Sequence, residues 1–244
     1  MHVEGFVIHL PRAVQRQPQV ERLLQVLPVP ARVVEAVDGR ALTQEQIAAV
    51  YRQRLYRPRY PFALAIGEIG CFLSHRKVWR EIVERGLDAG LIVEDDAEID
   101  ARHFPAAIDL ALEHLGTNGY IRFPWRNRGD VGEALAERNG ISLVEPKLVG
   151  LGTLAQLVSR EAAAKLLTAT ETFDRPVDTF LQLRWRHKAR MLAMRGAGVS
   201  NATNQVGGTT VQTKQKSLQK TLSREVNRSV YRLTLRALAA RHGI

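Results

Sequence analysis

The stretch GEIGCFLSHRKVWREIVERGLDAGLIVEDD, residues 67–96, points to the fold class. Residues 71–83 place their apolar side chains on one face of a helix, and Gly86 follows as a C-cap. The apolar run 90–93 predicts a buried strand that ends on three consecutive acids. Ligands of open α/β sheets bind at the carboxyl ends of the strands. The stretch therefore predicts a ligand site at a sheet edge.

The three acids are Glu94, Asp95 and Asp96. In an extended segment, Glu94 and Asp96 would point to one side and Asp95 to the other. Two carboxylates on one side repel unless a cation or an arginine neutralises them, and Mg²⁺ or Mn²⁺ can do this while also binding a phosphate. A solvated turn would explain three adjacent acids equally well. His75, on the buried face of the preceding helix, suits either a core position or a pocket wall.

The rest of the chain alternates strands and helices. Strand, helix and strand at 5–10, 17–27 and 31–37 form a β-α-β unit, which implies parallel pairing and a sheet covered by helices. The other expected elements are a helix over 44–52 with a Thr43/Gln46 capping box, a helix over 104–115, strands at 120–124, 142–144 and 154–158, a helix from Ser159 to Leu167, and a helix over 178–186. The segments 126–140 and 196–208 are expected to be loops, the first mobile or irregular.

Length and charge bound the possibilities. The 244 residues fit one large domain over 1–208, followed by a basic amphipathic helical extension over 209–244. The net charge of +10 favours anionic partners: phosphates, nucleotides, anionic lipid or nucleic acid. Cys71 is the only cysteine, which excludes an internal disulfide and favours a cytoplasmic location. No segment is apolar enough for a membrane span, so we expect any membrane contact to be peripheral, on the inner face.

Several motifs resemble glycosyltransferase family 25, which includes lipooligosaccharide and collagen galactosyltransferases. The most specific are GEIGCFLSH followed by Trp79, and LIVEDD; VIHLPRAVQR, AVDGRAL and PVDTFL match in the same order. The resemblance covers about residues 3–185. It implies an α/β, GT-A-like fold with a mixed, mostly parallel sheet and helices on both faces, here followed by the basic extension. It also implies a UDP-sugar donor, Mn²⁺ or Mg²⁺, and inverting transfer of a hexose, with galactose expected, to a saccharide acceptor such as lipooligosaccharide.

The same resemblance assigns roles to residues. Glu94 and Asp96 would bind the metal, and Asp178 would be the base that deprotonates the acceptor. An acid favoured by a helix N-terminus is the alternative explanation for Asp178. The residues expected to border the donor are Leu10, Arg12, Arg16, Asp38, Gly39, Ser74, His75 and Asp95. His187 is the only suggestion for a third metal ligand, and His9 and Gln156 depart from the family pattern.

Two other functions use the same features. A metal-dependent phosphotransferase or phosphatase could employ the acids, although no P-loop or phosphatase nucleophile motif supports it. Alternatively, the chain is a basic binding protein whose arginine- and tyrosine-rich segment 51–61 and basic extension grip nucleic acid or an anionic membrane. The ordered motifs favour the transferase, so nucleic acid is not the expected partner. A lipid-linked acceptor would suit a membrane-surface extension.

Overall fold

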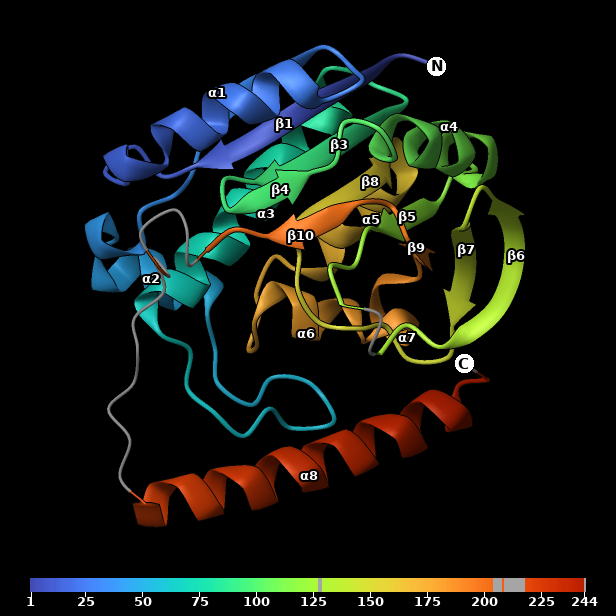
Figure 1. The fold of residues 1–244 in the computed structure, drawn as a ribbon. Helices are drawn as coiled ribbons and strands as arrows, with labels where there is room; N and C mark the ends of the chain where they lie inside the picture. Colours follow the sequence, from blue (N-terminus) through green and yellow to red (C-terminus); the bar gives the residue numbers. More distant parts are fainter. Residues whose placement is uncertain (127–128, 204–207, 209–217, 244) are drawn as a thin grey trace.

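The computed structural model describes residues 1–126, 129–203, 208 and 218–243. Within these residues an eight-stranded sheet forms the centre of the protein (Figure 1), in the order β2-β1-β3-β8-β5-β9-β7-β6. Its strands are β1 (Val3–His9), β2 (Ala31–Glu35), β3 (Ala89–Glu94), β5 (Gly119–Arg122), β6 (Gly132–Arg138), β7 (Ile141–Pro146), β8 (Ala155–Ser159) and β9 (Arg190–Arg195). A separate two-stranded sheet pairs β4 (Ala97–Ile99) with β10 (Val199–Asn201).

The strand directions make the central sheet mixed. β1 pairs in parallel with both β2 and β3, and β5 pairs in parallel with β9. β8 and β7 run antiparallel to their neighbours, so the other six of the eight strands point the same way. The carboxyl ends of β2, β1 and β3 consequently lie side by side at one edge. The predicted α/β class with a mixed, mostly parallel sheet is confirmed.

Helices cover both faces of the sheet (Figure 1). α1 (Gln17–Val26) and α4 (Phe104–His114) pack on one face, and α3 (Ile66–Glu84) and α5 (Arg160–Ala169) pack on the other. The side chains of β1 alternate between these two cores: Val7 belongs to the first, and Phe6 and Ile8 belong to the second. This alternation follows from the two-residue period of a strand. The predicted helices on both faces are confirmed.

Local capping signals act where the sequence places them. Thr43 accepts a hydrogen bond from the Gln46 amide and its own amide donates to the Gln46 side chain, which starts α2 (Gln44–Val50). The Ser159 hydroxyl caps α5 by accepting from the backbone N–H of Ala162. After α3, Gly86 has φ of +63°, the left-handed conformation of a C-cap.

Some elements differ from the sequence-based expectation. The segment 126–140 contains strand β6, which forms a hairpin with β7; residues 127–128 lie outside the described part. β6 is polar and mostly exposed, so its sequence has no apolar run that would predict a strand. The sequence signal for the hairpin is the Asn139-Gly140 turn, in which the two residues have φ of +51° and +78°. β10 also lies within the expected loop 196–208, of which 204–207 are not described. Strands β4 and β9 were not predicted.

The helix expected over 178–186 is two short helices. α6 (Val177–Leu181) and α7 (Arg184–His187) are separated at Leu183, whose φ of −85° and ψ of 57° are not helical. A fully buried Leu183 packs into the core at this break. Phe180, Leu181 and Leu183 are all buried, so their apolar spacing resembled that of a single helix. Phe180 and Leu181 lie in α6, whereas Leu183 lies between α6 and α7.

The basic extension forms α8 (Leu218–Arg241), which runs along the underside of the body in Figure 1. Tyr231, Leu235 and Ala239, spaced four residues apart, are buried against the body. Residues 209–217, the start of the predicted extension, lie outside the described part of the chain. The helical character of the extension is confirmed over 218–241, and its division from the domain at residue 208 stays a prediction. Among the described helices, none has the length and apolar character that a membrane crossing needs.

Candidate functional site

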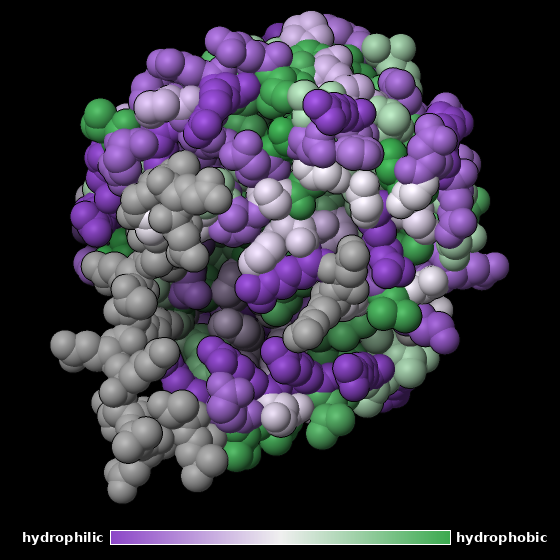
Figure 2. Space-filling view, in the orientation of Figure 1, coloured by the Kyte–Doolittle hydropathy of each residue, from purple (hydrophilic) through white to green (hydrophobic). Residues whose placement is uncertain are grey.

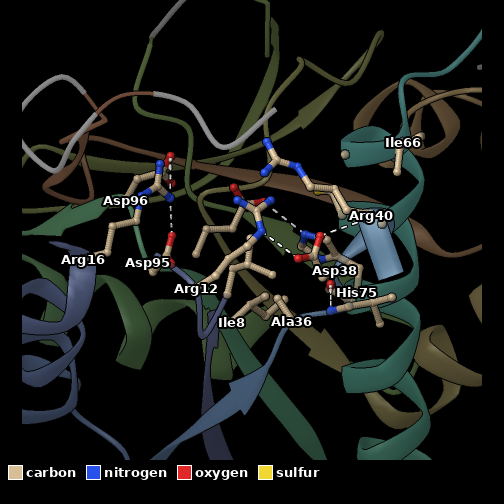
Figure 3. A pocket seen from close by; sticks show the side chains of 17 residues that line it. Ile8, Arg12, Arg16, Ala36, Asp38, Arg40, Ile66, His75, Asp95 and Asp96 are labelled. Atoms are coloured by element: carbon tan, nitrogen blue, oxygen red, sulfur yellow. Dashed lines mark hydrogen bonds and ion pairs between the residues drawn. The ribbon is translucent and has the colours of Figure 1, made fainter. Parts of the chain in front are cut away.

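A pocket of about 140 Å³ opens at the carboxyl ends of β1, β2 and β3 (Figure 3). All ten predicted metal and donor residues line it: Leu10, Arg12, Arg16, Asp38, Gly39, Ser74, His75, Glu94, Asp95 and Asp96. They come from the segments that follow β1 and β2, from the end of β3 and the turn after it, and from the middle of α3. The β-α-β pairing predicts this gathering, because the carboxyl ends of neighbouring parallel strands lie at the same edge.

Asp95 is buried and both of its carboxylate oxygens have partners. Oδ2 lies 2.7 Å from Nδ1 of His9, at the end of β1, and Oδ1 accepts a hydrogen bond from Arg16. His9, Arg16 and Asp95 are all less than 10% exposed, so the three form a buried polar cluster. In this arrangement Asp95 holds the Arg16 guanidinium against the pocket wall.

Asp96 is different, because one of its oxygens is unpaired. Oδ2 accepts from the Thr203 hydroxyl at 2.9 Å and lies 3.6 Å from the Arg16 guanidinium. Oδ1 is buried and accepts no hydrogen bond from any described residue. Burial, and then the negative charge of Glu94, raise the pKa of Asp96 to about 6. A buried, desolvated carboxylate with a spare oxygen is suited to a cation.

Glu94 joins two elements that are far apart in the chain. Its Oε1 lies 3.0 Å from Nε2 of the buried His75 in α3 and accepts from the Thr153 hydroxyl at 2.6 Å. The expected split, with Asp95 facing away from its two neighbours, is wrong: Arg16 contacts both Asp95 and Asp96. The alternation fails because the strand ends at Glu94 and the next two residues form a turn. All three acids line the same pocket.

The donor atoms present fit a divalent cation. Asp96 offers an unpaired buried oxygen, and Glu94, two residues earlier in the chain, lines the same pocket. Carboxylate oxygens are the ligands that Mg²⁺ and Mn²⁺ prefer. Ligand atoms of Cys71, His75 and Glu94 also lie within 4.8 Å of one another. Burial raises the pKa of the Cys71 thiol well above its usual range, which disfavours the thiolate form as a ligand.

The β2 side of the pocket carries a second polar group. Nε of Arg12 donates to Asp38 Oδ2 at 2.7 Å, and the backbone N–H of Arg40 donates to Oδ1 at 3.0 Å. The Arg40 amide and then the Arg12 guanidinium lower the pKa of Asp38, so it stays ionised. Gly39 leaves no space for a side chain, since a Cβ would lie 2.1 Å from the carbonyl oxygen of Ile66.

Ser74 serves the scaffold. Its hydroxyl accepts from the backbone N–H of Val37 at 2.8 Å and donates to the Gly70 carbonyl at 2.7 Å. The side chain is 1% exposed. Ser74 therefore ties α3 to the segment that follows β2, and it positions Asp38 and Gly39 at the pocket rim.

Asp178, the predicted base, lies in the first turn of α6 and does not line this pocket. Its Oδ1 accepts from the backbone N–H of Thr179 at 2.6 Å, which agrees with an acid placed at a helix N-terminus. Its Oδ2 accepts from the backbone N–H of Gly152 at 3.0 Å. The next residue, Thr153, donates to Glu94. Asp178 and the pocket are thus connected through the two residues 152 and 153.

Several contributors were not predicted from the sequence. Thr153 and Thr203 pair with Glu94 and Asp96 from loops distant in the chain. Gln156 accepts from the Tyr120 hydroxyl at 2.9 Å and donates to the Thr153 carbonyl, so it holds the segment that contacts Glu94. A polar residue inside a buried strand was the available signal for Gln156, which is fully buried.

His187 does not supply a third metal ligand. Its Nε2 lies 3.0 Å from the carbonyl oxygen of Leu181, and its Nδ1 accepts from the backbone N–H of Ala189 at 3.1 Å. Burial lowers the pKa of His187 to about 4. The ring is a neutral core histidine with both nitrogens occupied.

Comparison with known proteins identifies the family of the chain. The sequence profile of glycosyltransferase family 25 (LPS biosynthesis protein) matches residues 2–181, and the chain belongs to this family. It is 34% identical over 190 residues to human procollagen galactosyltransferase 2, covering 75% of this chain and 30% of that protein. A bovine relative, described as a probable inactive glycosyltransferase 25 family member 3, is 33% identical over 191 residues, covering 74% of this chain and 31% of that protein.

The chain spans about a third of the length of these curated relatives. Among solved structures, a glycosyltransferase involved in glycosylation of the major capsid of PBCV-1 is similar, with 11% identity and a TM-score of 0.44 over 79% of this chain and 81% of that one. This degree of structural similarity gives no information about function. Because one relative is described as inactive, family membership alone does not decide activity, and the site must be judged on its own residues.

Proposed function

We propose that the protein is a metal-dependent inverting glycosyltransferase that moves a hexose from a UDP-sugar to a saccharide acceptor. Galactose is the expected sugar, and the expected acceptor is a saccharide, free or lipid-linked, such as lipooligosaccharide. The observation that carries the proposal is the unpaired, buried oxygen of Asp96 beside Glu94, in a pocket that also holds arginines. Family membership and the similarity to procollagen galactosyltransferases support the choice of reaction.

The pocket side chains suit a nucleoside diphosphate. Arg12 is 38% exposed at the rim, where its guanidinium is accessible to a phosphate, whereas Arg16 is 3% exposed and fixed by Asp95. Asp38, held ionised and oriented by Arg12 and the Arg40 amide, is an acceptor for a ribose or base N–H or O–H group. Ile8 and Ala36 add an apolar wall.

Asp96 and Glu94 would hold Mn²⁺ or Mg²⁺ against the diphosphate. When bound, the ion would supply electrophilic assistance by offsetting the charge that develops on the leaving UDP. Arg16 would stabilise the same charge from the other side, since its guanidinium lies 3.6 Å from Asp96. His75 and Thr153 fix the Glu94 carboxylate, so the acids keep their geometry while the donor binds.

Inversion needs a base on the acceptor side, and Asp178 is the residue we assign. Gly152 and Thr179 donate to its two oxygens, which orients the carboxylate. The carboxylate would accept the proton of the acceptor hydroxyl as that oxygen attacks the sugar. A phosphotransferase is the weaker alternative, because none of the described pocket residues indicates a site for a phosphoryl acceptor.

Release of UDP from a panel of UDP-sugars, with Mn²⁺, Mg²⁺ or EDTA, tests the proposal without knowledge of the acceptor. We expect metal-dependent hydrolysis of one UDP-hexose, and a loss of at least 100-fold in Asp96→Asn. Asp109→Asn, an exposed acid on α4, is the matched control and should keep full activity. Calorimetry should show weaker Mn²⁺ binding only in Asp96→Asn. Undiminished, metal-dependent release in Asp96→Asn would refute the metal site, and release of inorganic phosphate would favour the phosphotransferase.

A further inference from the structure

A second, larger cavity of about 600 Å³ lies between α8 and the body. It has the size of a small-molecule site. Figure 2 shows hydrophilic side chains gathered over the lower part of the molecule, where α8 runs. The cavity walls combine arginines with aromatic rings: Arg126, Arg228, Arg232 and Arg236, with Tyr60, Phe62, Trp125 and Tyr231. None of the described residues that line it is an Asp or a Glu. The cavity is therefore strongly cationic.

The three α8 arginines follow one another at intervals of four residues, about 6 Å apart along the helix axis. Arg228 is paired with Glu225 at 2.6 Å. Arg232 and Arg236 form no ion pair with any described residue. Two guanidiniums without a carboxylate partner, at the wall of a concave cavity, can bind a phosphate or carboxylate of a ligand.

The helix that carries these arginines is held in place by its buried side. The Tyr231 hydroxyl accepts from Nη1 of the fully buried Arg175 at 2.9 Å, and the Tyr231 ring packs edge-on against Tyr60 at 5.5 Å. Near the end of the helix, His242 stacks on Trp185 at 5.3 Å. The arginine row consequently has a defined position against the body.

The cavity borders the predicted base. Gly152 and Thr179 line it, and both donate backbone hydrogen bonds to the Asp178 carboxylate. The next residue, Thr153, donates to Glu94 in the donor pocket. Residues 152 and 153 thus connect the cavity to the donor pocket, and Asp178, which lines neither, is hydrogen-bonded to two residues of the cavity wall. An acceptor bound against Gly152 and Thr179 would lie close to Asp178.

We propose that this cavity binds the acceptor, and that the acceptor is an anionic saccharide whose phosphate or carboxylate group pairs with Arg232 and Arg236. Trp125, which is 36% exposed, and Tyr60 provide apolar ring surface for the sugar. This inference rests on the proposed glycosyltransferase function and adds the substrate class. The selecting residues lie in α8, beyond residues 2–181 that match the family profile.

Two matched pairs of probes test the charge preference: lactose with 3′-sialyllactose, and N-acetylglucosamine with its 6-phosphate. Binding is measured by titration calorimetry on the full chain. We expect the anionic member of at least one pair to bind ten times more tightly or better, and this preference to fall below twofold in Arg232→Gln/Arg236→Gln. Arg241→Gln, an exposed arginine on the same helix outside the cavity, and Arg232→Lys/Arg236→Lys should keep the preference.

Equal or undetectable binding of both members of both pairs, or a preference that survives in the double Gln variant, overturns the inference. If the double Gln variant instead loses only co-sedimentation with phosphatidylglycerol vesicles, the arginines serve a membrane surface and the inference is also wrong. UDP-sugar hydrolysis should be equal in all of these variants, because α8 does not line the donor pocket. Absence of hydrolysis in the unmodified protein would refute the proposed function separately, since glycan binding is measured without a donor.

Discussion

Arg122 and Asp130 form a buried ion pair beneath the loop that separates the two pockets. Nη1 of Arg122 donates to both carboxylate oxygens of Asp130, at 2.7 and 2.6 Å, and each side chain is 3% exposed. The pair also holds the loop 149–152: Arg122 Nη2 donates to the carbonyls of Leu151 and Gly152, and Asp130 accepts from the Gly150 amide at 2.8 Å. We expect the loop to depend on this pair.

Arg122→Met should reduce the free energy of unfolding by about 3–5 kcal/mol, because it leaves the Asp130 charge buried without a partner. Asp130→Leu should cost a similar amount by stranding Arg122. For a domain whose total stability is roughly 5–15 kcal/mol, either single change approaches the limit of folding. The double variant should lose less unfolding free energy than the two single variants together, by about 2 kcal/mol or more. The reason is that an apolar pair of similar volume removes both charges from the interior.

Urea unfolding followed by the fluorescence of the three tryptophans measures the full double-mutant cycle. The folded double variant should still release UDP from the donor, whereas transfer to an acceptor should fall at least tenfold, because the loop 149–152 next to Asp178 loses three hydrogen bonds to Arg122 and Asp130. A single variant that loses less than about 1 kcal/mol, or strictly additive losses, would refute the view that this buried pair supports the loop.

Three further changes test separate parts of the fold. Gly39→Ala should cost several kcal/mol or prevent folding, because the added Cβ would lie 2.1 Å from the Ile66 carbonyl oxygen; an unchanged melting temperature would contradict this. Because the pKa of His187 is about 4 in the folded protein, only the unfolded chain binds a proton at this residue between pH 6.5 and 4. The free energy of unfolding should therefore fall by up to about 3 kcal/mol as the pH decreases through that window. His187→Gln should flatten this pH dependence, whereas His103→Gln, at an exposed position, should not. Tyr231→Phe removes a hydrogen bond from a buried arginine and should speed amide hydrogen exchange in α8; unchanged exchange would show that the helix is held by its apolar contacts alone.

Most of the ten pocket residues could be gathered from the sequence because they follow a recognisable strand, and Ser74 and His75 because they lie on the buried face of a recognisable helix. Glu94 and Asp38 come after apolar runs, and parallel pairing brings those strand ends to one edge. Thr153 and Thr203 could not be found in this way. They lie 59 and 107 residues from the acids that they contact, on loops whose course depends on the whole fold. Neither residue type carries a pattern of its own.

The second cavity escaped prediction for a similar reason. The spacing of its arginines predicts an amphipathic basic helix, but nothing in that spacing says whether the basic side faces solvent, a membrane or the protein. The deciding residues are Tyr231 and Leu235, which are buried against the body and so turn Arg232 and Arg236 toward the cavity. A period of four also drifts around a helix of 3.6 residues per turn, which blurs the boundary between its faces.

Gln156 departs from the family pattern and has a hydrogen-bond partner at each polar end of its side chain. An aromatic residue is the expected one at this position, and a buried amide without partners would be costly there. Its oxygen accepts from Tyr120 and its nitrogen donates to the Thr153 carbonyl, so both polar ends are used. The amide thereby fixes the residue whose hydroxyl donates to Glu94 and whose neighbour holds Asp178. A polar side chain in the core consequently links the acids of the donor pocket to the carboxylate on the acceptor side.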